Sequence, residues 1–307
     1  MVVQWATALY FMSAILKETN NDLIINLAHT GLIPTKEMTP HVPVSVSEII
    51  EDIHECWEVG ITMVHVHARD PRTGVATYRA EIYQDIITGI RKYAPELVIC
   101  VSLSGRSFNS FEQRSEPLLL EGYAKPDMGS LTLSSLNFNN QASINEPEMI
   151  KALAEMMKTK GIAPELEAFD AGMINYAHYL AKKDLITPPF YFNLLLGNIA
   201  CAQPDLLHAG IMIRDLPSNS YWSLTGIGQF QFQMNAIAIA MGGGVRVGLE
   251  DNIWFDSGRT KLARNADLLR RVHKFAEDCE RSLMKSAELR RKLNLASGIN
   301  GQYGNHA

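Results

Sequence analysis

The sequence predicts one (β/α)8 barrel, a TIM barrel with an N-terminal extension and C-terminal helices, and three observations lead to this fold. Eight short apolar runs recur along the 307 residues, each followed by a polar turn and a helix-like segment, and their starts lie 24 to 39 residues apart. No two-residue hairpin turn separates neighbouring runs, which argues against an antiparallel meander. No glycine-rich phosphate-binding motif follows the first run, which disfavours a doubly wound parallel sheet.

The eight runs are the expected strands of the barrel. In chain order they are residues 23–29, 62–68, 97–104, 129–135, 164–169, 189–196, 221–226 and 245–251. Apolar and polar side chains alternate within the third run, where Ile99 and Val101 share one strand face and Ser102 lies on the other. We expect the apolar face to pack on the outer helices and the polar face to carry functional groups near the C-terminal end of the barrel.

Both ends of the chain are expected to lie outside this repeating pattern, within a single domain of residues 1–307. Residues 1–16 are apolar, but the first basic residue is Lys17 and the stretch is shorter than the ~18 residues of a membrane span. We interpret residues 1–20 as an N-terminal extension whose helix docks on the barrel or on a partner subunit, with membrane targeting as the alternative. Residues 259–307 are expected to form a C-terminal helical region.

The composition is typical of a cytoplasmic globular protein that binds neither nucleic acid nor a membrane. Hydrophobic residues make up 47% of the chain, which excludes disorder, and a net charge of -5 provides no excess of cations for nucleic acid phosphates. The four cysteines show no paired short spacing and are expected to be reduced packing residues; they are Cys56, Cys100, Cys201 and Cys279.

Two histidines in the second run form the clearest candidate metal site. His65 and His67 are two residues apart on a strand, so both neutral imidazoles lie on one face and can share a divalent cation at about 2.0–2.1 Å. Hydrogen-bonded core histidines are the alternative interpretation. Glu250, near the end of the eighth run, is the best candidate for a third ligand, and pairing with Arg246 is its alternative role.

The residues around this carboxylate form a candidate proton-transfer group. Asp251 follows Glu250 and is expected to point elsewhere, where it can accept a proton while a nearby cation keeps it ionised. Arg246 and Glu167, both on inward polar faces, are expected to orient it and to adjust its pKa. A salt-bridge network that braces the mouth of the barrel is the alternative.

Small residues of the third and fourth runs are candidates for ligand binding. Ser102 and Ser130 offer hydroxyl groups, and Gly105 offers a backbone amide that a ligand can approach closely. Such groups suit a carboxylate or carbonyl oxygen, and small residues that only fill space are the alternative.

Five segments of the chain together resemble the β-keto acid cleavage enzymes. They follow the family's order and are His29–Ser45, Val64–Asp70, Pro164–Met173, Leu224–Gln231 and Gly242–Asn252. The resemblance implies a zinc-dependent (β/α)8 barrel, and a homotetramer, in which a β-keto acid reacts with acetyl-CoA. The implied products are acetoacetate and a new acyl-CoA.

The resemblance also implies roles for individual residues. It implies that His65, His67 and Glu250 bind the zinc ion. Asp251 is the implied catalytic aspartate, and Arg246 and Glu167 are the implied supporting members of a proton relay. Contacts to substrate oxygens fall on Ser102, Gly105 and Ser130, the last being a threonine in the typical member. Ile33 stands where the aminohexanoate-cleaving member has a glutamate that pairs with the substrate ammonium. We therefore expect neutral aliphatic or hydroxylated β-keto acids to be preferred over 3-keto-5-aminohexanoate. A polar or anionic group held by His29 and Lys36 is the alternative.

Other functions remain open at this point. A metal-dependent acyl-CoA lyase similar to hydroxymethylglutaryl-CoA lyase uses related chemistry, and a zinc amidohydrolase would need further histidines on the fifth and sixth strands. A carrier that only binds keto acids is the non-enzymatic alternative. The stretch 259–292 holds 11 Lys and Arg residues against five acidic ones, which indicates a solvated or intersubunit face, or attraction of CoA phosphates.

Overall fold

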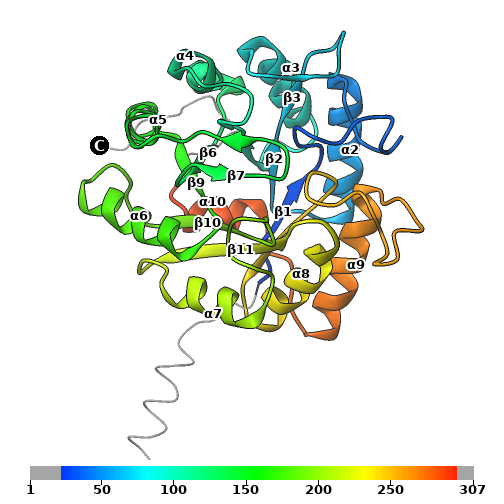
Figure 1. Ribbon diagram of the computed structural model, residues 1–307. Helices are drawn as coiled ribbons and strands as arrows, with labels where there is room; N and C mark the ends of the chain where they lie inside the picture. Colours follow the sequence, from blue (N-terminus) through cyan, green and yellow to red (C-terminus); the bar gives the residue numbers. More distant parts are fainter. Residues whose placement is uncertain (1–21, 296–307) are drawn as a thin grey trace, which may run out of the picture.

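The computed structural model describes residues 22–295, in which eight parallel strands close into a barrel (Figure 1). The strands follow one another around the barrel in chain order, and the last pairs with the first. They are β1 (Ile25–Ala28), β2 (Met63–Val66), β5 (Val98–Val101), β6 (Met128–Thr132), β9 (Ala163–Ala168), β10 (Phe190–Leu196), β11 (Ser220–Gly226) and β12 (Gly244–Val247). Each overlaps one predicted run, so the predicted (β/α)8 barrel is confirmed.

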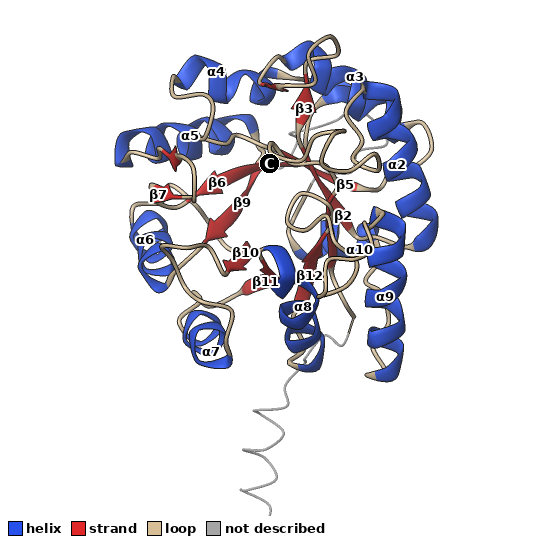
Figure 2. Cartoon of the chain, turned by 45° about the vertical axis from the view of Figure 1, so that its right-hand side comes forward, coloured by secondary structure: helices blue, strands red, loops and turns tan. Residues whose placement is uncertain are grey.

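Helices surround the barrel, as Figure 2 shows in blue around the red strands. The α-helices are α2 (Val46–Val59), α3 (Ala80–Arg91), α4 (Phe111–Ser115), α5 (Pro147–Lys160), α6 (Ala171–Lys182), α7 (Leu206–Arg214), α8 (Gln231–Ala240), α9 (Asn265–Asp278) and α10 (Ser286–Lys292), and the 3₁₀ helices are η1 (Glu116–Leu119), η2 (Gly122–Ala124) and η3 (Gly228–Phe230). Helix α2 begins with a capping box, in which the Ser45 hydroxyl accepts from the Glu48 backbone N–H and the Glu48 carboxylate accepts from the Ser45 N–H. Ile49, Ile53 and Cys56 then face the core at helical spacing.

The strands contribute to two separate cores. Ile99 and Val101 of β5 face outward and join the large core between strands and helices, as the alternation predicts. Val98 and Cys100 face inward and join a smaller core inside the barrel, which includes Leu289 of α10. The interior is therefore apolar where the strands begin, and its polar groups gather where the strands end.

Two short antiparallel pairs at the strand ends were not expected from the sequence. The pair β3 (Ala68–Arg69) and β4 (Ala76–Thr77) follows β2, and the pair β7 (Leu136–Asn137) and β8 (Ala142–Ser143) follows β6. Strands of two residues are too short for an alternating pattern to reveal them. The second pair matters for function because its turn contributes to the central cavity.

The predicted N-terminal extension, residues 1–20, lies outside the described residues, and so do residues 296–307 of the predicted C-terminal helical region. The described part of that region contains α9 and α10. None of the helices within residues 22–295 is long and apolar enough to cross a membrane.

Candidate active site

Three predicted metal ligands meet at the C-terminal end of the barrel. His65 lies on β2 and His67 directly follows it, with both rings buried on the inward face. Their Nε2 atoms lie 3.3 Å apart, and the Nε2 atom of His67 lies 3.2 Å from Oε1 of Glu250. Both residue types are common zinc ligands. The sequence therefore predicts correctly which three side chains come together, and the structure adds their spacing.

The donor atoms of this group fit a divalent cation. Nδ1 of His65 lies 2.5 Å from Oε2 of Glu165, so this nitrogen donates, and in the neutral ring Nε2 is the atom available to a metal. Ligand atoms bound to one ion at about 2.0–2.1 Å lie roughly 3.3 Å apart in tetrahedral geometry. The second carboxylate oxygen of Glu250 is buried and has no hydrogen-bond partner among residues 22–295. The three residues thus offer two imidazole nitrogens and one carboxylate oxygen at the spacing of a metal site.

Glu165 supports this group from beneath and was missed by the sequence analysis. It lies on β9, and its other oxygen accepts a hydrogen bond of 2.7 Å from Asn26 of β1. The thiol of Cys100 lies 3.2 Å from the oxygen that contacts His65. Burial raises the pKa of Glu165, but His65 outweighs burial and lowers it to about 2. A carboxylate two residues before Glu167 on the same strand face was the available signal.

The loop after β12 differs from the predicted strand. The predicted eighth strand continued to residue 251, but β12 ends at Val247 and Gly248 has a φ of 153°. A Cβ atom at Gly248 would lie 2.1 Å from the carbonyl oxygen of Ala28, so only glycine permits this approach to β1. Glu250 and Asp251 therefore lie in a turn rather than on a strand face.

This turn brings both carboxylates to one guanidinium, which overturns the expectation that Asp251 points away from Glu250. Arg246, buried on β12, places Nη2 2.7 Å from Oε1 of Glu250 and Nε 2.9 Å from Oδ2 of Asp251. Its Nη1 lies 3.7 Å from Oε1 of Glu167. The ion-pair network and the candidate catalytic group, which the sequence analysis treated as alternatives, are thus the same residues.

The network also sets the charges of its acids. Burial raises the pKa of Asp251 above its ordinary value, although Arg246 opposes this. Burial likewise raises the pKa of Glu250, but Arg246 and His67 outweigh it and hold that pKa well below its usual range. Two adjacent carboxylates thus differ in basicity, with Asp251 the better proton acceptor.

Glu167 is held by a neighbour that the sequence analysis did not select. The register of β6 and β9 places Thr132 opposite Glu167, and the threonine hydroxyl donates a hydrogen bond of 2.7 Å to Oε2. Burial raises the pKa of Glu167, with His65 and Arg246 opposing it. Thr132 also faces the cavity, so it belongs to the site.

The three predicted contacts to substrate oxygens occupy different surroundings. Ser102 lines the cavity. The Ser130 hydroxyl accepts a hydrogen bond of 3.0 Å from the backbone N–H of Leu103, which ties β6 to the loop after β5. The Gly105 carbonyl accepts from the N–H of Ile144 at 3.1 Å. Within the described part of the chain, Ser102 is the only one of the three that borders the cavity.

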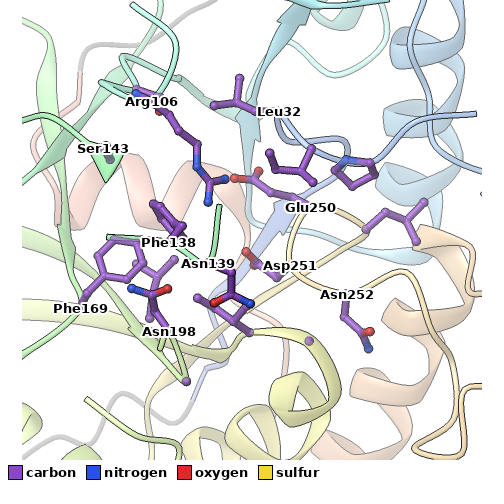
Figure 3. A pocket seen from close by; sticks show the side chains of 18 of the residues that line it. Leu32, Arg106, Phe138, Asn139, Ser143, Phe169, Asn198, Glu250, Asp251 and Asn252 are labelled. Carbon is purple, nitrogen blue, oxygen red and sulfur yellow. The ribbon is translucent and has the colours of Figure 1, made fainter. Parts of the chain in front are cut away.

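A cavity of about 590 Å³ lies at the mouth of the barrel, above the candidate metal ligands (Figure 3). The three candidate metal ligands line it, together with Asp251, Glu167 and Ile33. Loop residues that the sequence analysis did not select also line it. The latter include Arg106, Phe138, Asn139, Phe169, Asn198 and Asn252. They lie on loops that follow different strands, so no local pattern groups them.

The family model for beta-keto acid cleavage enzymes matches residues 22–295, which is the whole described part of the chain. The chain belongs to this family. Three relatives match this chain along nearly their whole length. The 3-keto-5-aminohexanoate cleavage enzyme of Fusobacterium nucleatum is 34% identical over 89% of this chain and 98% of its own.

Other relatives within the family differ in the substrate they are named for. The 3-oxoadipate:acetyl-CoA acetyltransferase of Cupriavidus necator is 33% identical over 89% of this chain and 95% of its own. The 3-dehydrocarnitine:acetyl-CoA trimethylamine transferase of Rhizobium meliloti is 31% identical over 90% and 97%. Family membership therefore leaves the group attached to the keto acid open.

A likeness to a solved structure agrees with the fold. ObcA, in its binary complex with oxaloacetate, aligns with a TM-score of 0.72 over 84% of this chain and 68% of that chain. Its sequence is 18% identical, so the likeness supports the barrel alone.

Proposed function

We propose that this family member is a zinc-dependent transferase that condenses a β-keto acid with acetyl-CoA and releases acetoacetate and a new acyl-CoA. The observation that carries the proposal is the meeting of His65, His67 and Glu250 beside Asp251, with Arg246 bound to both acids. The names of two relatives, transferases that use acetyl-CoA, support the choice of co-substrate.

The residues of the site have separate roles in this reaction. When bound, a divalent cation at His65, His67 and Glu250 supplies a Lewis acid for the ketone oxygen of the keto acid. Asp251 takes the proton from C2, between the ketone and the carboxylate, because it is the more basic of the two adjacent acids. Arg246 orients Asp251 and is itself neutralised by the surrounding carboxylates.

The bonds formed and broken balance without another reactant. The C2 carbanion attacks the thioester carbonyl of acetyl-CoA, which forms a carbon–carbon bond and expels the CoA thiolate. The thiolate then attacks the original ketone carbon, and the bond between that carbon and C2 breaks. The released acetoacetate takes the proton back from Asp251. Ser102, the one of the three expected contacts that borders the cavity among the described residues, is the proposed contact for a substrate oxygen.

The direct test is a reaction with 3-oxohexanoate and acetyl-CoA, followed by mass spectrometry. The zinc-loaded protein should produce equal amounts of butyryl-CoA and acetoacetate, and His67→Ala should produce neither. Free CoA and acetate in place of butyryl-CoA would contradict the transfer and favour hydrolysis. Formation of acyl-CoA from a hydroxyacyl-CoA alone would favour the acyl-CoA lyase alternative.

The zinc amidohydrolase alternative receives less support from the donor groups. Among residues 22–295, the clusters that could hold a metal contain no histidine besides His65 and His67. The strands β9 and β10, where further histidines are needed, place Glu167 and Asn193 in register instead.

The assembly and location of the protein are also proposals. We expect a cytoplasmic location, because the four cysteines are free thiols. We also expect a homotetramer, which the resemblance to this family implies. Light scattering coupled to size exclusion should give four times the mass of one 34.2 kDa chain.

A further inference from the structure

Arg106 is a cation of the cavity wall that none of the steps above uses. It lies in the turn after β5, and its guanidinium carbon is 3.4 Å from the centre of the Phe138 ring. Phe138, in the turn between β7 and β8, in turn packs edge-on against Phe169 with ring centres 5.9 Å apart. Figure 3 shows the Arg106 side chain reaching into the cavity beside Phe138, with Phe169 on the far side of that ring.

The charge on Arg106 is not neutralised by a neighbour. Within residues 22–295 no ion pair includes this side chain, and its Nε atom is buried without a hydrogen-bond partner. Burial lowers the pKa of Arg106, and the negative charge of Glu250 opposes this. A guanidinium stacked on a ring keeps its N–H edge available, and this edge matches the two oxygens of a carboxylate.

The remaining charges of the cavity wall point to an anionic ligand as well. The three acidic residues that line it, Glu167, Glu250 and Asp251, all face Arg246. Apart from that group, the charged lining residues are Arg106 and Arg259. As far as residues 22–295 form it, the outer wall therefore has no carboxylate for a positively charged substrate and two cations for a negatively charged one.

The position of Arg106 relative to Asp251 indicates which part of the substrate it meets. In the view of Figure 3, the Arg106 guanidinium lies to the left of the Glu250 carboxylate, with Leu32 above that carboxylate and Asp251 below it. In the proposed reaction C2 lies at Asp251 and the ketone lies beside Glu250. The group attached to the ketone on its far side then leads away from Asp251 and toward Arg106.

We propose that Arg106 binds a carboxylate at the far end of the keto acid, so that β-keto dicarboxylates are the preferred substrates. This inference rests on the proposed function and narrows it. Phe138 holds the guanidinium in place, and the apolar wall at Leu32 and Ile33 accommodates the methylene groups between the ketone and the distal carboxylate.

The test compares 3-oxoadipate with 3-oxohexanoate, which has six carbons and no second carboxylate. The zinc-loaded enzyme should have the higher kcat/KM for 3-oxoadipate, and Arg106→Gln should lower the ratio of the two values about 100-fold. Arg106→Lys, which keeps the charge without the fork, should lower it less. Arg259→Gln removes the other cation of the outer wall and should change the ratio by less than about threefold.

Several results would overturn the proposal. An equal loss on both keto acids would mean that Arg106 meets the carboxylate that all β-keto acids share. A raised KM for acetyl-CoA with an unchanged ratio would assign it to a CoA phosphate. An equal change of the ratio in Arg259→Gln would make the effect one of net charge.

Calorimetry with the unreactive acids separates this inference from the proposed function. Zinc-loaded protein should bind adipate more tightly than hexanoate, and Arg106→Gln should abolish that difference. If the enzyme converts neither keto acid, the proposed function is wrong, while an Arg106-dependent preference for adipate would still support the distal carboxylate site. Equal binding of adipate and hexanoate by the unaltered protein would overturn the site itself.

Discussion

Arg246 and Asp251 are five residues apart in the chain and make two contacts, Nε to Oδ2 at 2.9 Å and Nη2 to Oδ1 at 3.2 Å. The turn at Gly248 makes this possible, because it ends β12 and folds the next residues back over the strand end. A side-on pairing of this kind fixes the aspartate in one orientation. The proposed base is thus held by its own strand.

Asp251→Asn should keep the fold and the bound metal and lose turnover about 10²–10⁴-fold, because an amide cannot accept the C2 proton. Exchange of the C2 hydrogen with deuterated solvent, followed by NMR, should slow in parallel. Asp215→Asn, an exposed aspartate paired with Arg214, serves as the control and should exchange at the normal rate. Normal exchange in Asp251→Asn would move the base to another residue.

His67→Ala should reduce zinc content from one ion per chain to a small fraction, since it removes one of the three proposed ligands. Metal analysis of protein dialysed against a weak chelator measures this. His54→Ala is the matched control, because that side chain is half-exposed, pairs with Glu58 across one helical turn and packs against the Tyr93 ring. Full zinc content in a folded His67→Ala protein would rule out the assigned site.

Ile33 should disfavour a positively charged substrate. It lines the cavity with 48% of its surface exposed and has no charge to offer an ammonium group. We expect kcat/KM to be higher for 3-oxohexanoate than for 3-keto-5-aminohexanoate, and Ile33→Glu to shift the ratio about tenfold toward the amino compound. Ile199→Glu adds the same charge on another loop of the wall, and an equal shift there would disprove a specific role for position 33.

Asp52, which lies behind the active site, should make the stability of the protein depend on pH. Its carboxylate accepts a hydrogen bond of 2.8 Å from the Asn265 side-chain amide. The same amide group also donates to the His29 carbonyl, and its oxygen accepts from the Leu249 N–H. Burial raises its pKa to about 7; the Asn265 hydrogen bond opposes this, and Glu55 adds to it. Because the folded state holds this proton more tightly, the free energy of unfolding should fall as pH rises from about 4 to about 7.

Asp52→Asn should remove this dependence and make the protein more stable at pH 8. Urea unfolding at pH 5, 6, 7 and 8 measures the free energy of unfolding of the variant and of the unaltered protein. The difference between the two free energies should widen by no more than about 1.4 kcal/mol per pH unit. The nearby Arg264 and Lys36 favour the charged form and keep the pKa of Asp52 from rising further. The slope should flatten as pH passes about 7, where folded Asp52 loses its proton. A difference that is constant with pH would show that Asp52 is ionised throughout.

Local periodicity accounts for the parts of the site that could be predicted. His65 and His67 share a face because side chains on a strand alternate, and this holds whatever the rest of the chain does. The same rule separates Val101 from Ser102. Glu165 could not be paired with His65 in this way, because their contact joins strands 100 residues apart.

The amino-acid sequence by itself determined the eight strands, their inward and outward faces and the family, since these depend on short-range spacing and residue type. Only the tertiary structure decided that Glu250 and Asp251 share Arg246, because the turn at Gly248 depends on a close approach to β1. It also decided that Arg106 stacks on Phe138, since these residues lie on loops after different strands. Contacts between such loops arise from closure of the barrel, which brings all strand ends to one rim, and no local pattern records them.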